Sequence, residues 1–195
     1  MTGRPTQRRR VEEGIGESVR TVESLLPQAD RIAALSAAIV KALKRGAKIL
    51  TAGNGGSAAE ALHMSEELVG RFRGDRVSLP AVALVADSTA LTCIGNDFGY
   101  DRVFSRQVEG LGRAGDVLVL LSTSGRAANL RLAMEAARAR RMITVCLLGR
   151  DGGPLAGQAD FEVIVAAHAT ERIQEAHQVI IHLILDAVES AFAKD

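Results

Sequence analysis

Apolar residues along the first 45 positions recur at three- and four-residue spacing, which places them on one face of a helix. The first such pattern covers residues 10–26, and its apolar members are Val11, Ile15, Val19, Val22 and Leu26. A second pattern covers residues 30–45 and stops before Gly46, the residue type most common just after a helix. Together the patterns predict an N-terminal helical extension over residues 1–45.

From residue 47 onward, short and continuous apolar runs alternate with helical patterns. The runs predict strands at 47–51, 81–85, 116–121, 142–148 and 161–165, and the periodic stretches predict helices at 57–72, 88–94, 101–111, 129–140 and 170–192. Strands that are apolar throughout belong to parallel sheets covered on both faces. The fold class expected is therefore α/β, a doubly wound five-stranded parallel sheet flanked by helices, with residues 46–195 as one structural unit.

Composition narrows the function classes. Aromatic residues are only 3% of the 195 residues and Trp is absent, so a base-stacking platform for nucleic acid is not expected. A formal net charge of +1 gives no reason to expect nucleic acid or membrane as a partner, and Arg8, Arg9 and Arg10 are interpreted as a solvated cluster. Cys93 and Cys146 have no CxxC spacing, and no signal peptide or membrane span is evident, which favours a reducing, cytoplasmic location.

Two turns have the composition of an anion site. The sequence GNGGSA at residues 53–58 follows the first predicted strand, and STSG at residues 122–125 follows the third. Each opens a helix, whose first N–H groups are unpaired and attract anions. The alternative is ordinary turn chemistry, with Ser57 as a helix cap. Neither turn is a P-loop or a typical dinucleotide turn, so a smaller phosphorylated ligand is favoured.

His63 and Glu67 are four residues apart on the helix that opens at the first turn, so they share one helix face. An imidazole and a carboxylate at this spacing suit a divalent metal or acid–base chemistry. A surface ion pair is the alternative for this spacing alone. Asn96 and Asp97 similarly suit either sugar hydroxyls or an ordinary helix end.

The last predicted helix carries Gln174, His177 and His182. His182 lies in an apolar run, where a histidine is often only a core residue. Gln174 and His182 are eight residues apart, about 12 Å along a helix. One ion could contact both only if the side chains lean toward each other, and otherwise two chains contribute.

Four segments together resemble the sugar isomerase (SIS) domain family, and within it the phosphoheptose isomerases. They are AGNGGSAAEALHMSEELVGRF, LPAVALVADSTALTCIGNDFGYDRVFSRQV, GDVLVLLSTSG and ERIQEAHQVIIH. The resemblance runs from about residue 46 to residue 192 and implies that 46–195 is an SIS phosphosugar-binding domain. It also implies conversion of sedoheptulose 7-phosphate to D-glycero-D-manno-heptose 7-phosphate, a bound zinc, and a homotetramer with inter-subunit active sites.

The resemblance also implies roles for particular residues. The zinc ligands fall on His63, Glu67, Gln174 and His182, and the base and acid of an enediol mechanism fall on Glu67 and His182. Substrate contacts fall on Asn54, Gly55, Gly56, Arg71, Asn96, Asp97, Ser122, Thr123, Ser124 and Gln174. One position departs from the family pattern, because Ala127 stands where a phosphate-binding Ser is usual.

Two alternatives remain at this stage. One relative of the phosphoheptose isomerases is a regulatory protein that binds a DNA-replication initiator, but it does not keep the His/Glu/His set intact. Another SIS enzyme, acting on a different phosphosugar, is left open by Ala127.

Overall fold

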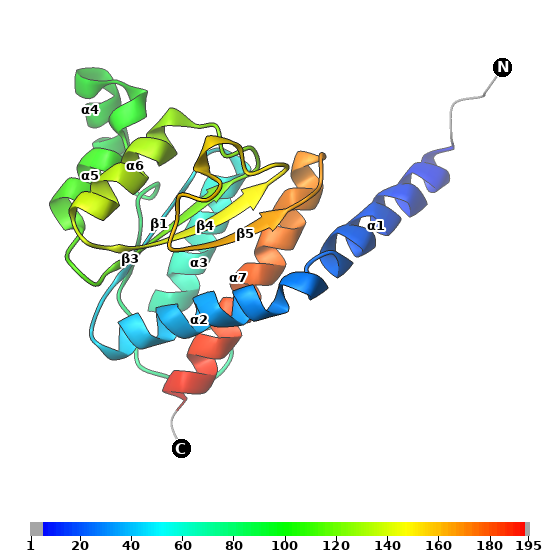
Figure 1. Ribbon diagram of the computed structural model, residues 1–195, viewed down its shortest axis with the longest axis horizontal. Coiled ribbons are helices and arrows are strands. Elements are labelled where there is room, and N and C mark those ends of the chain that lie inside the picture. Colours follow the sequence, from blue (N-terminus) through cyan, green and yellow to red (C-terminus); the bar gives the residue numbers. More distant parts are fainter. Residues whose placement is uncertain (1–5, 194–195) are drawn as a thin grey trace.

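The computed structural model describes residues 6–193 (Figure 1). Its α-helices are α1 Gln7–Glu23, α2 Ala29–Lys44, α3 Gly56–Val69, α4 Ser88–Phe98, α5 Ser105–Leu111, α6 Ala128–Ala139 and α7 Thr170–Phe192. Its strands are β1 Ile49–Gly53, β2 Ala81–Ala83, β3 Val117–Ser122, β4 Ile143–Gly149 and β5 Phe161–Val165. Short 3-10 helices cover Leu26–Gln28, Tyr100–Arg102 and Gly153–Leu155.

Within residues 6–193, the strands form a five-stranded parallel sheet in the order β2-β1-β3-β4-β5. The chain runs outward from β1 to β2, and then returns to the other side of β1 and continues outward through β3, β4 and β5. The switch point, where α/β sheets bind ligands, therefore lies between the carboxyl ends of β1 and β3. The predicted doubly wound fold is confirmed.

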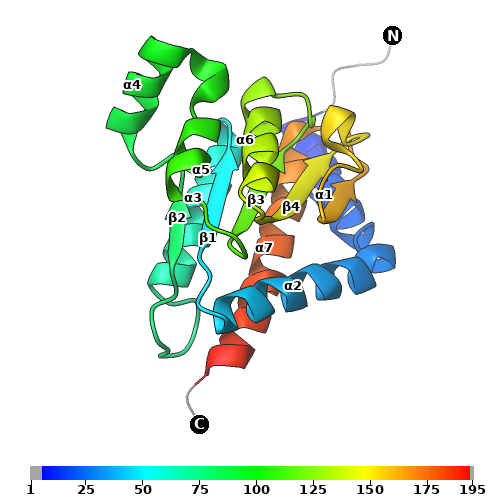
Figure 2. The same cartoon turned by 60° about the vertical axis from the view of Figure 1, so that its left-hand side comes forward.

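Each face of the sheet has its own core. Along β3, Val117, Val119 and Leu121 face one cluster, and Leu118 and Leu120 face the other. The first cluster is covered by α2, α3 and α7, and the second by α5 and α6 (Figure 2). All six β3 residues are buried, which explains why the strand is apolar on both faces from Val117 to Leu121, before it ends at Ser122.

The two N-terminal helices differ in their packing. Helix α2 belongs to the core, where Leu35 and Ile39 are fully buried. Helix α1 has no buried residue and extends away from the sheet (Figure 1). The Arg172 guanidinium on α7 donates a hydrogen bond to Ser18, which ties α1 to the start of α7. The predicted boundary at residue 45 stays a prediction, since α2 packs as part of the sheet's own core.

Several element ends differ from the sequence prediction. Strand β1 begins at Ile49 rather than 47, because the Lys48 amide donates to the Asp116 carboxylate at 3.0 Å rather than to a neighbouring strand. The helix predicted over 101–111 is divided, since Val103 and Phe104 turn inward to fill the second core. Helix α4 continues to Phe98, four residues past its predicted end.

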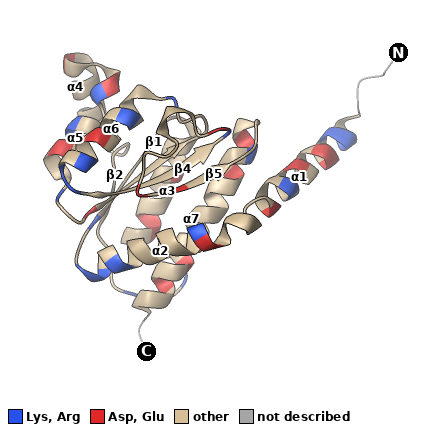
Figure 3. Cartoon of the chain, viewed as in Figure 1, with Lys and Arg blue, Asp and Glu red and all other residues tan. Residues whose placement is uncertain are grey.

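Charged residues lie mainly on the helices and loops, and the strands of the sheet carry few (Figure 3). In the part of the chain that the structure describes, no helix has the length and hydropathy needed to cross a bilayer.

Asp116 joins the starts of β1 and β3. Its carboxylate accepts hydrogen bonds from the backbone amides of Lys48 (3.0 Å) and Arg113 (2.8 Å) and from the Lys48 ammonium. Burial alone would raise the pKa of Asp116, but these donors and the Lys48 charge outweigh it and lower the pKa. The carboxylate therefore stabilises the fold above its unfolded pKa, and this contribution is lost as the pH falls through the folded pKa.

We expect Asp116→Ala to lower the free energy of unfolding at pH 7 by about 2 kcal/mol, because charged hydrogen bonds are lost and their donors are left unpaired. The difference from the wild type should shrink in acid. Urea unfolding at several pH values measures both effects. Glu135→Ala is the matched control, since the Arg131–Glu135 pair is half exposed and should change stability by less than about 0.5 kcal/mol. Equal losses in the two variants would contradict this account.

Candidate active site at the carboxyl ends of the strands

The two predicted anion turns are neighbours at the switch point. The turn before α3 follows β1, the turn before α6 follows β3, and β1 and β3 pair directly. In both helices the N-cap residue, Gly55 or Ala127, makes no side-chain hydrogen bond to the first turn. By contrast, α4 is capped by Asp87, which accepts from the Ala90 amide at 2.9 Å. Ser57 is therefore not the cap of α3, and two uncapped helix N-termini face one site.

Asparagine side chains hold the two turns together. Asn54 and Asn129 exchange hydrogen bonds of 3.0 and 2.9 Å between their amide groups. The Tyr100 hydroxyl also donates to the Asn54 side-chain oxygen, at 3.1 Å, and so ties the segment after α4 to the same place. The last turn of α4, which carries Asn96 and Asp97, is thereby kept near the turns, although both side chains are exposed.

The STSG turn depends on one glycine. Gly125 has a φ of +62°, and a Cβ there would lie 1.8 Å from the Gly152 carbonyl oxygen. Its amide donates to the Ser122 hydroxyl at 2.9 Å, which closes the turn. Thr123 and Ser124 are half-buried within this closed turn. Arg126 just beyond it pairs with Asp151 at 3.3 Å.

Helices α3 and α7 pack beside each other in the same direction, because each follows a parallel strand and starts at its carboxyl end. Residues of the two helices meet at three levels along their length. At the first level, nearest the turns, Gln174 packs on Gly56, where an added Cβ would lie 2.2 Å from the Gln174 amide nitrogen. At the next level the Glu60 carboxylate lies 4.0 Å from the His177 ring. At the third level the Nε2 atoms of His63 and His182 are 3.2 Å apart.

The third level is a cluster of potential metal ligands. His63 Nε2 lies 3.9 Å from a Glu67 carboxylate oxygen, and His63 Nδ1 lies 3.4 Å from Glu66. One ligand atom from each of His63, Glu66 and Glu67 lies within 4.8 Å of the others. The Gln178 amide nitrogen is 2.9 Å from His182 Nε2 and completes the surroundings.

This donor set fits zinc. Two nitrogen ligands about 2.0–2.1 Å from one tetrahedral zinc ion lie about 3.3 Å apart. The observed Nε2–Nε2 distance of 3.2 Å between His63 and His182 matches that separation. Glu67 would need only a small rotamer change to join them, whereas Glu66 is on the opposite nitrogen of His63.

The His63–His182 cluster lies at the surface of the protein, where His63 is half-buried and His182 is exposed. The His182 ring packs 5.6 Å from the Phe72 ring and 5.4 Å from the His63 ring. Partial burial and the neighbouring His63 and Arg73 lower the pKa of His182, and Glu67 opposes them. A neutral imidazole, the form that binds metal ions, is thus favoured at neutral pH.

The structure leaves one predicted ligand away from this cluster on the same chain. Gln174 lies beside Gly56, about 12 Å along α7 from His182, so a role at this cluster would need Gln174 of another copy. Arg71 follows the end of α3 nearest the cluster, just before Phe72, whose ring packs on His182, and it lies about 21 Å along the helix from the glycine-rich turn. The predicted roles of both residues remain predictions.

Sequence reasoning did not single out Asn129, Glu60, Glu66 or Gln178. Asn129 and Glu60 each sit in the first turns of a helix that opens at an anion turn, so their position was an available signal. Gln178 is four residues before His182, the same spacing that made His63 and Glu67 visible.

Comparison with known proteins identifies the family to which the chain belongs. The SIS domain family model matches residues 15–149. The phosphoheptose isomerase of Geobacter metallireducens is 54% identical over 164 residues, which cover 84% of this chain and 87% of the relative. That of Sulfurimonas denitrificans is 44% identical over 181 residues, covering 93% and 91%. This chain belongs to the phosphoheptose isomerases of the SIS domain family.

Solved structures agree with the family assignment. A phosphoheptose isomerase from Francisella tularensis superposes with a TM-score of 0.92 at 32% identity. One from Neisseria gonorrhoeae gives 0.88 at 43% identity. Each match covers 95% of this chain and 100% of the other. The resemblance stated from the sequence is therefore confirmed.

Ala127, the departure from the family pattern, is the N-cap of α6 and has the extended backbone of an N-cap residue, φ −71° and ψ 123°. We expect Ala127→Ser to stabilise the protein by about 1 kcal/mol in the absence of ligand, because the hydroxyl would accept from an unpaired amide of the first turn. Thermal unfolding should show a rise of about 2–4 °C.

Ala128→Ser is the matched control for this substitution. Residue 128 is already within the helix, where a hydroxyl cannot cap the same amides, so no comparable rise is expected. Equal midpoints for Ala127→Ser and the wild type would show that the first turn of α6 is not short of a hydrogen-bond partner.

Proposed function

We propose that this protein isomerises sedoheptulose 7-phosphate to D-glycero-D-manno-heptose 7-phosphate, the first step toward nucleotide-activated heptose. The observation that carries the proposal is the intact set of His63, Glu67 and His182, gathered at one place in a phosphoheptose isomerase fold. A cytoplasmic location is part of the proposal.

The phosphate is assigned to the two turns at the switch point. Donors without a formal charge are the Gly56 amide at the start of α3, the first amides of α6, and the hydroxyls of Ser122, Thr123 and Ser124. The next two amides of α3, of Ser57 and Ala58, already donate to the Asn54 and Gly55 carbonyls. Backbone approach is possible at Gly55 and Gly56, which carry no side chain. Asn54, Asn96 and Asp97 are proposed to bind the sugar hydroxyls.

The reaction moves a proton between C1 and C2. Glu67 would take the proton from C1 of the ketose while the carbonyl oxygen at C2 gains one, which gives an enediol. Delivery of a proton to C2 and loss of the proton from the C1 hydroxyl then give the aldose. His182 is assigned as the partner acid. Its ring lies beside that of His63 and close enough to Glu67 for the carboxylate to affect the pKa of His182.

Zinc is proposed as the cofactor, one ion per subunit. His63, Glu67 and His182 would hold it, with Gln174 as a further ligand. When bound, the ion would act as a Lewis acid that polarises the oxygens on C1 and C2. The second Glu67 oxygen would stay available for proton transfer.

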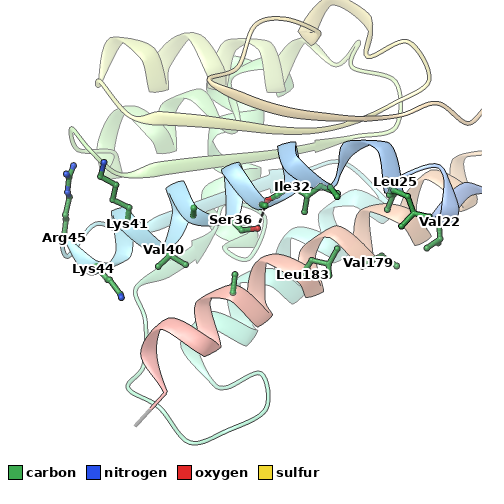
Figure 4. Close-up of a pocket in the computed structure, with 15 residues that line it drawn as sticks. Val22, Leu25, Ile32, Ser36, Val40, Lys41, Lys44, Arg45, Val179 and Leu183 are labelled. Carbon is green, nitrogen blue, oxygen red and sulfur yellow. Dashed lines mark hydrogen bonds between the residues drawn. The ribbon is translucent and has the colours of Figure 1, made fainter. Parts of the chain in front are cut away.

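A homotetramer with inter-subunit sites is also proposed. Val11, Ile15 and Val19 form an apolar stripe on α1 and are 51%, 61% and 50% exposed. An open apolar groove of about 880 Å³ lies between α2 and α7, with residues such as Val179 and Leu183 along it (Figure 4). We propose that other copies of the chain cover these surfaces and that one of them supplies Gln174, which on its own chain lies beside Gly56 rather than at the His63–His182 cluster.

A single assay distinguishes the proposed function from the two alternatives, a regulatory protein and an enzyme that acts on a different phosphosugar. Incubating the purified protein with sedoheptulose 7-phosphate should give the aldose phosphate, detected by NMR. Dialysis against a chelator should slow the reaction and added zinc should restore it. A regulatory protein would give no turnover, and an enzyme for a different phosphosugar would turn over only its own substrate.

In the same assay we expect Glu67→Gln to lower kcat at least about 1,000-fold, because the amide cannot accept the carbon-bound proton. Binding of inorganic phosphate, which needs only the turns, should be unchanged. Glu66→Gln is the matched control, since Glu66 is adjacent in sequence and 65% exposed, and it should keep most of its activity. Full activity in Glu67→Gln would remove Glu67 from the mechanism.

We expect Ile15→Glu to dissociate the oligomer, since a charge in a buried apolar contact is costly. Sedimentation should show smaller species, and isomerase activity should fall with dissociation because sites are shared between copies. Glu13→Gln changes the opposite face of α1 and should leave both unchanged. A fully active monomer would contradict the inter-subunit site.

A further inference from the structure

Glu60 and His177 form the middle level between α3 and α7, and neither has a role in the reaction described above. Glu60 is 8% exposed and His177 is fully buried. One carboxylate oxygen of Glu60 lies 4.0 Å from His177 Nδ1. Among the described residues, neither Glu60 oxygen and neither His177 ring nitrogen has a hydrogen-bond partner.

Such a pair is unfavourable unless its polar atoms satisfy one another. Buried polar groups are nearly always hydrogen-bonded, and an unpaired one loses its hydration without compensation. A gap of 4.0 Å is too long for a direct bond, but a rotation of either side chain or one bridging water would close it. Ser57 lies near Glu60 and the Leu148 carbonyl near His177, but each can take up only one of the polar atoms of its neighbour. The remaining atoms of Glu60 and His177 can bond to each other.

Their surroundings favour a pair with no net charge. Burial raises the pKa of Glu60 to about 7, with the Ser57 side chain opposing the shift. Burial also lowers the pKa of His177 to about 4, with the Leu148 carbonyl opposing. From about pH 4 to about pH 7 the protonated carboxyl can thus donate to the unprotonated ring nitrogen of a neutral imidazole.

The pair sits between the two parts of the proposed site. Glu60 is four residues after Gly56, which contacts Gln174, and three residues before His63. His177 is three residues after Gln174 and five before His182. Any sliding or rotation of α3 against α7 would change both the Gly56–Gln174 contact near the turn and the His63–His182 spacing. Glu60 and His177 face each other between these two contacts.

The stability of the fold does not by itself explain why a glutamate and a histidine occupy positions 60 and 177. Apolar side chains of similar size would fill the interface between α3 and α7, here called the seam, without burying polar atoms. Replacing both members of a buried polar pair in this way is often neutral or stabilising. The first core cluster already supplies apolar packing on both sides, through Ala61 and Met64 of α3 and Ile173 and Ile180 of α7.

We propose that Glu60 and His177 are positioning residues: hydrogen-bonded to each other across the seam, they fix α3 against α7 and so set the spacing of His63 and His182 relative to the phosphate turns. This inference rests on the proposed isomerase function. The pair does not contact the substrate; it acts through the residues one helical turn to either side.

The test is a double variant, Glu60→Met with His177→Leu, which fills the seam with apolar atoms. It should unfold at the wild-type temperature or above, yet its kcat should fall about 10- to 100-fold with little change in KM, because a small misplacement of reacting groups is costly. Its cobalt-substituted form should also show a changed visible absorption spectrum, because the geometry of the metal ligands shifts. Wild-type kcat and spectrum in the double variant would overturn the proposal.

Glu60→Gln is the conservative control, because its amide can donate to His177 as the protonated carboxyl does. We expect it to keep most of the wild-type kcat and the wild-type cobalt spectrum. Should the double variant fail to fold, His177→Leu alone decides by the same two readings, and normal values there would likewise overturn the proposal. If the wild type does not act on sedoheptulose 7-phosphate, the proposed function fails, whereas the cobalt spectra still report on the pair.

Discussion

The site depends on the parallel packing of α3 against α7. Because both helices start at the carboxyl edge of one sheet, residues near their starts face the turns and residues two turns later face each other. This arrangement puts Gln174 against Gly56 and the His63 ring beside that of His182, although the paired residues are more than 100 positions apart. In the proposed function, phosphate binding and proton transfer take place at two levels of this one helix pair.

The sheet supplies the other half of the site. Its order places β1 next to β3, and the reciprocal Asn54–Asn129 hydrogen bonds join the two turns that follow them. Neither α3 nor α6 uses a side-chain cap at this edge. The Ser57 and Ala58 amides of α3 donate to the Asn54 and Gly55 carbonyls, which leaves the Gly56 amide and the first turn of α6 for an anion. In the proposed function, the substrate phosphate would accept hydrogen bonds from these free amides.

Much of this could be predicted from the sequence. Unbroken apolar runs indicated a parallel sheet, and the range of α7 was predicted without error because its apolar face is periodic over 23 residues. The glycine-rich turns and the His63–Glu67 spacing are local patterns, so they were visible too. What depends on the register between helices was not: the Glu60–His177 contact and the place of Gln178 beside His182 follow from how α3 and α7 slide together. Spacing also showed that one ion could contact both Gln174 and His182 only if their side chains leaned toward each other, and in the structure Gln174 lies against Gly56 instead.

The central claim is that one chain brings His63 and His182 to a single metal ion beside the substrate. Anomalous diffraction at the zinc absorption edge, from crystals of the zinc-loaded protein, locates that ion directly. The account predicts one peak per subunit, about 2.0–2.1 Å from Nε2 of both His63 and His182 of the same chain. A zinc peak elsewhere, or one bound by only one of these two histidines, would contradict it.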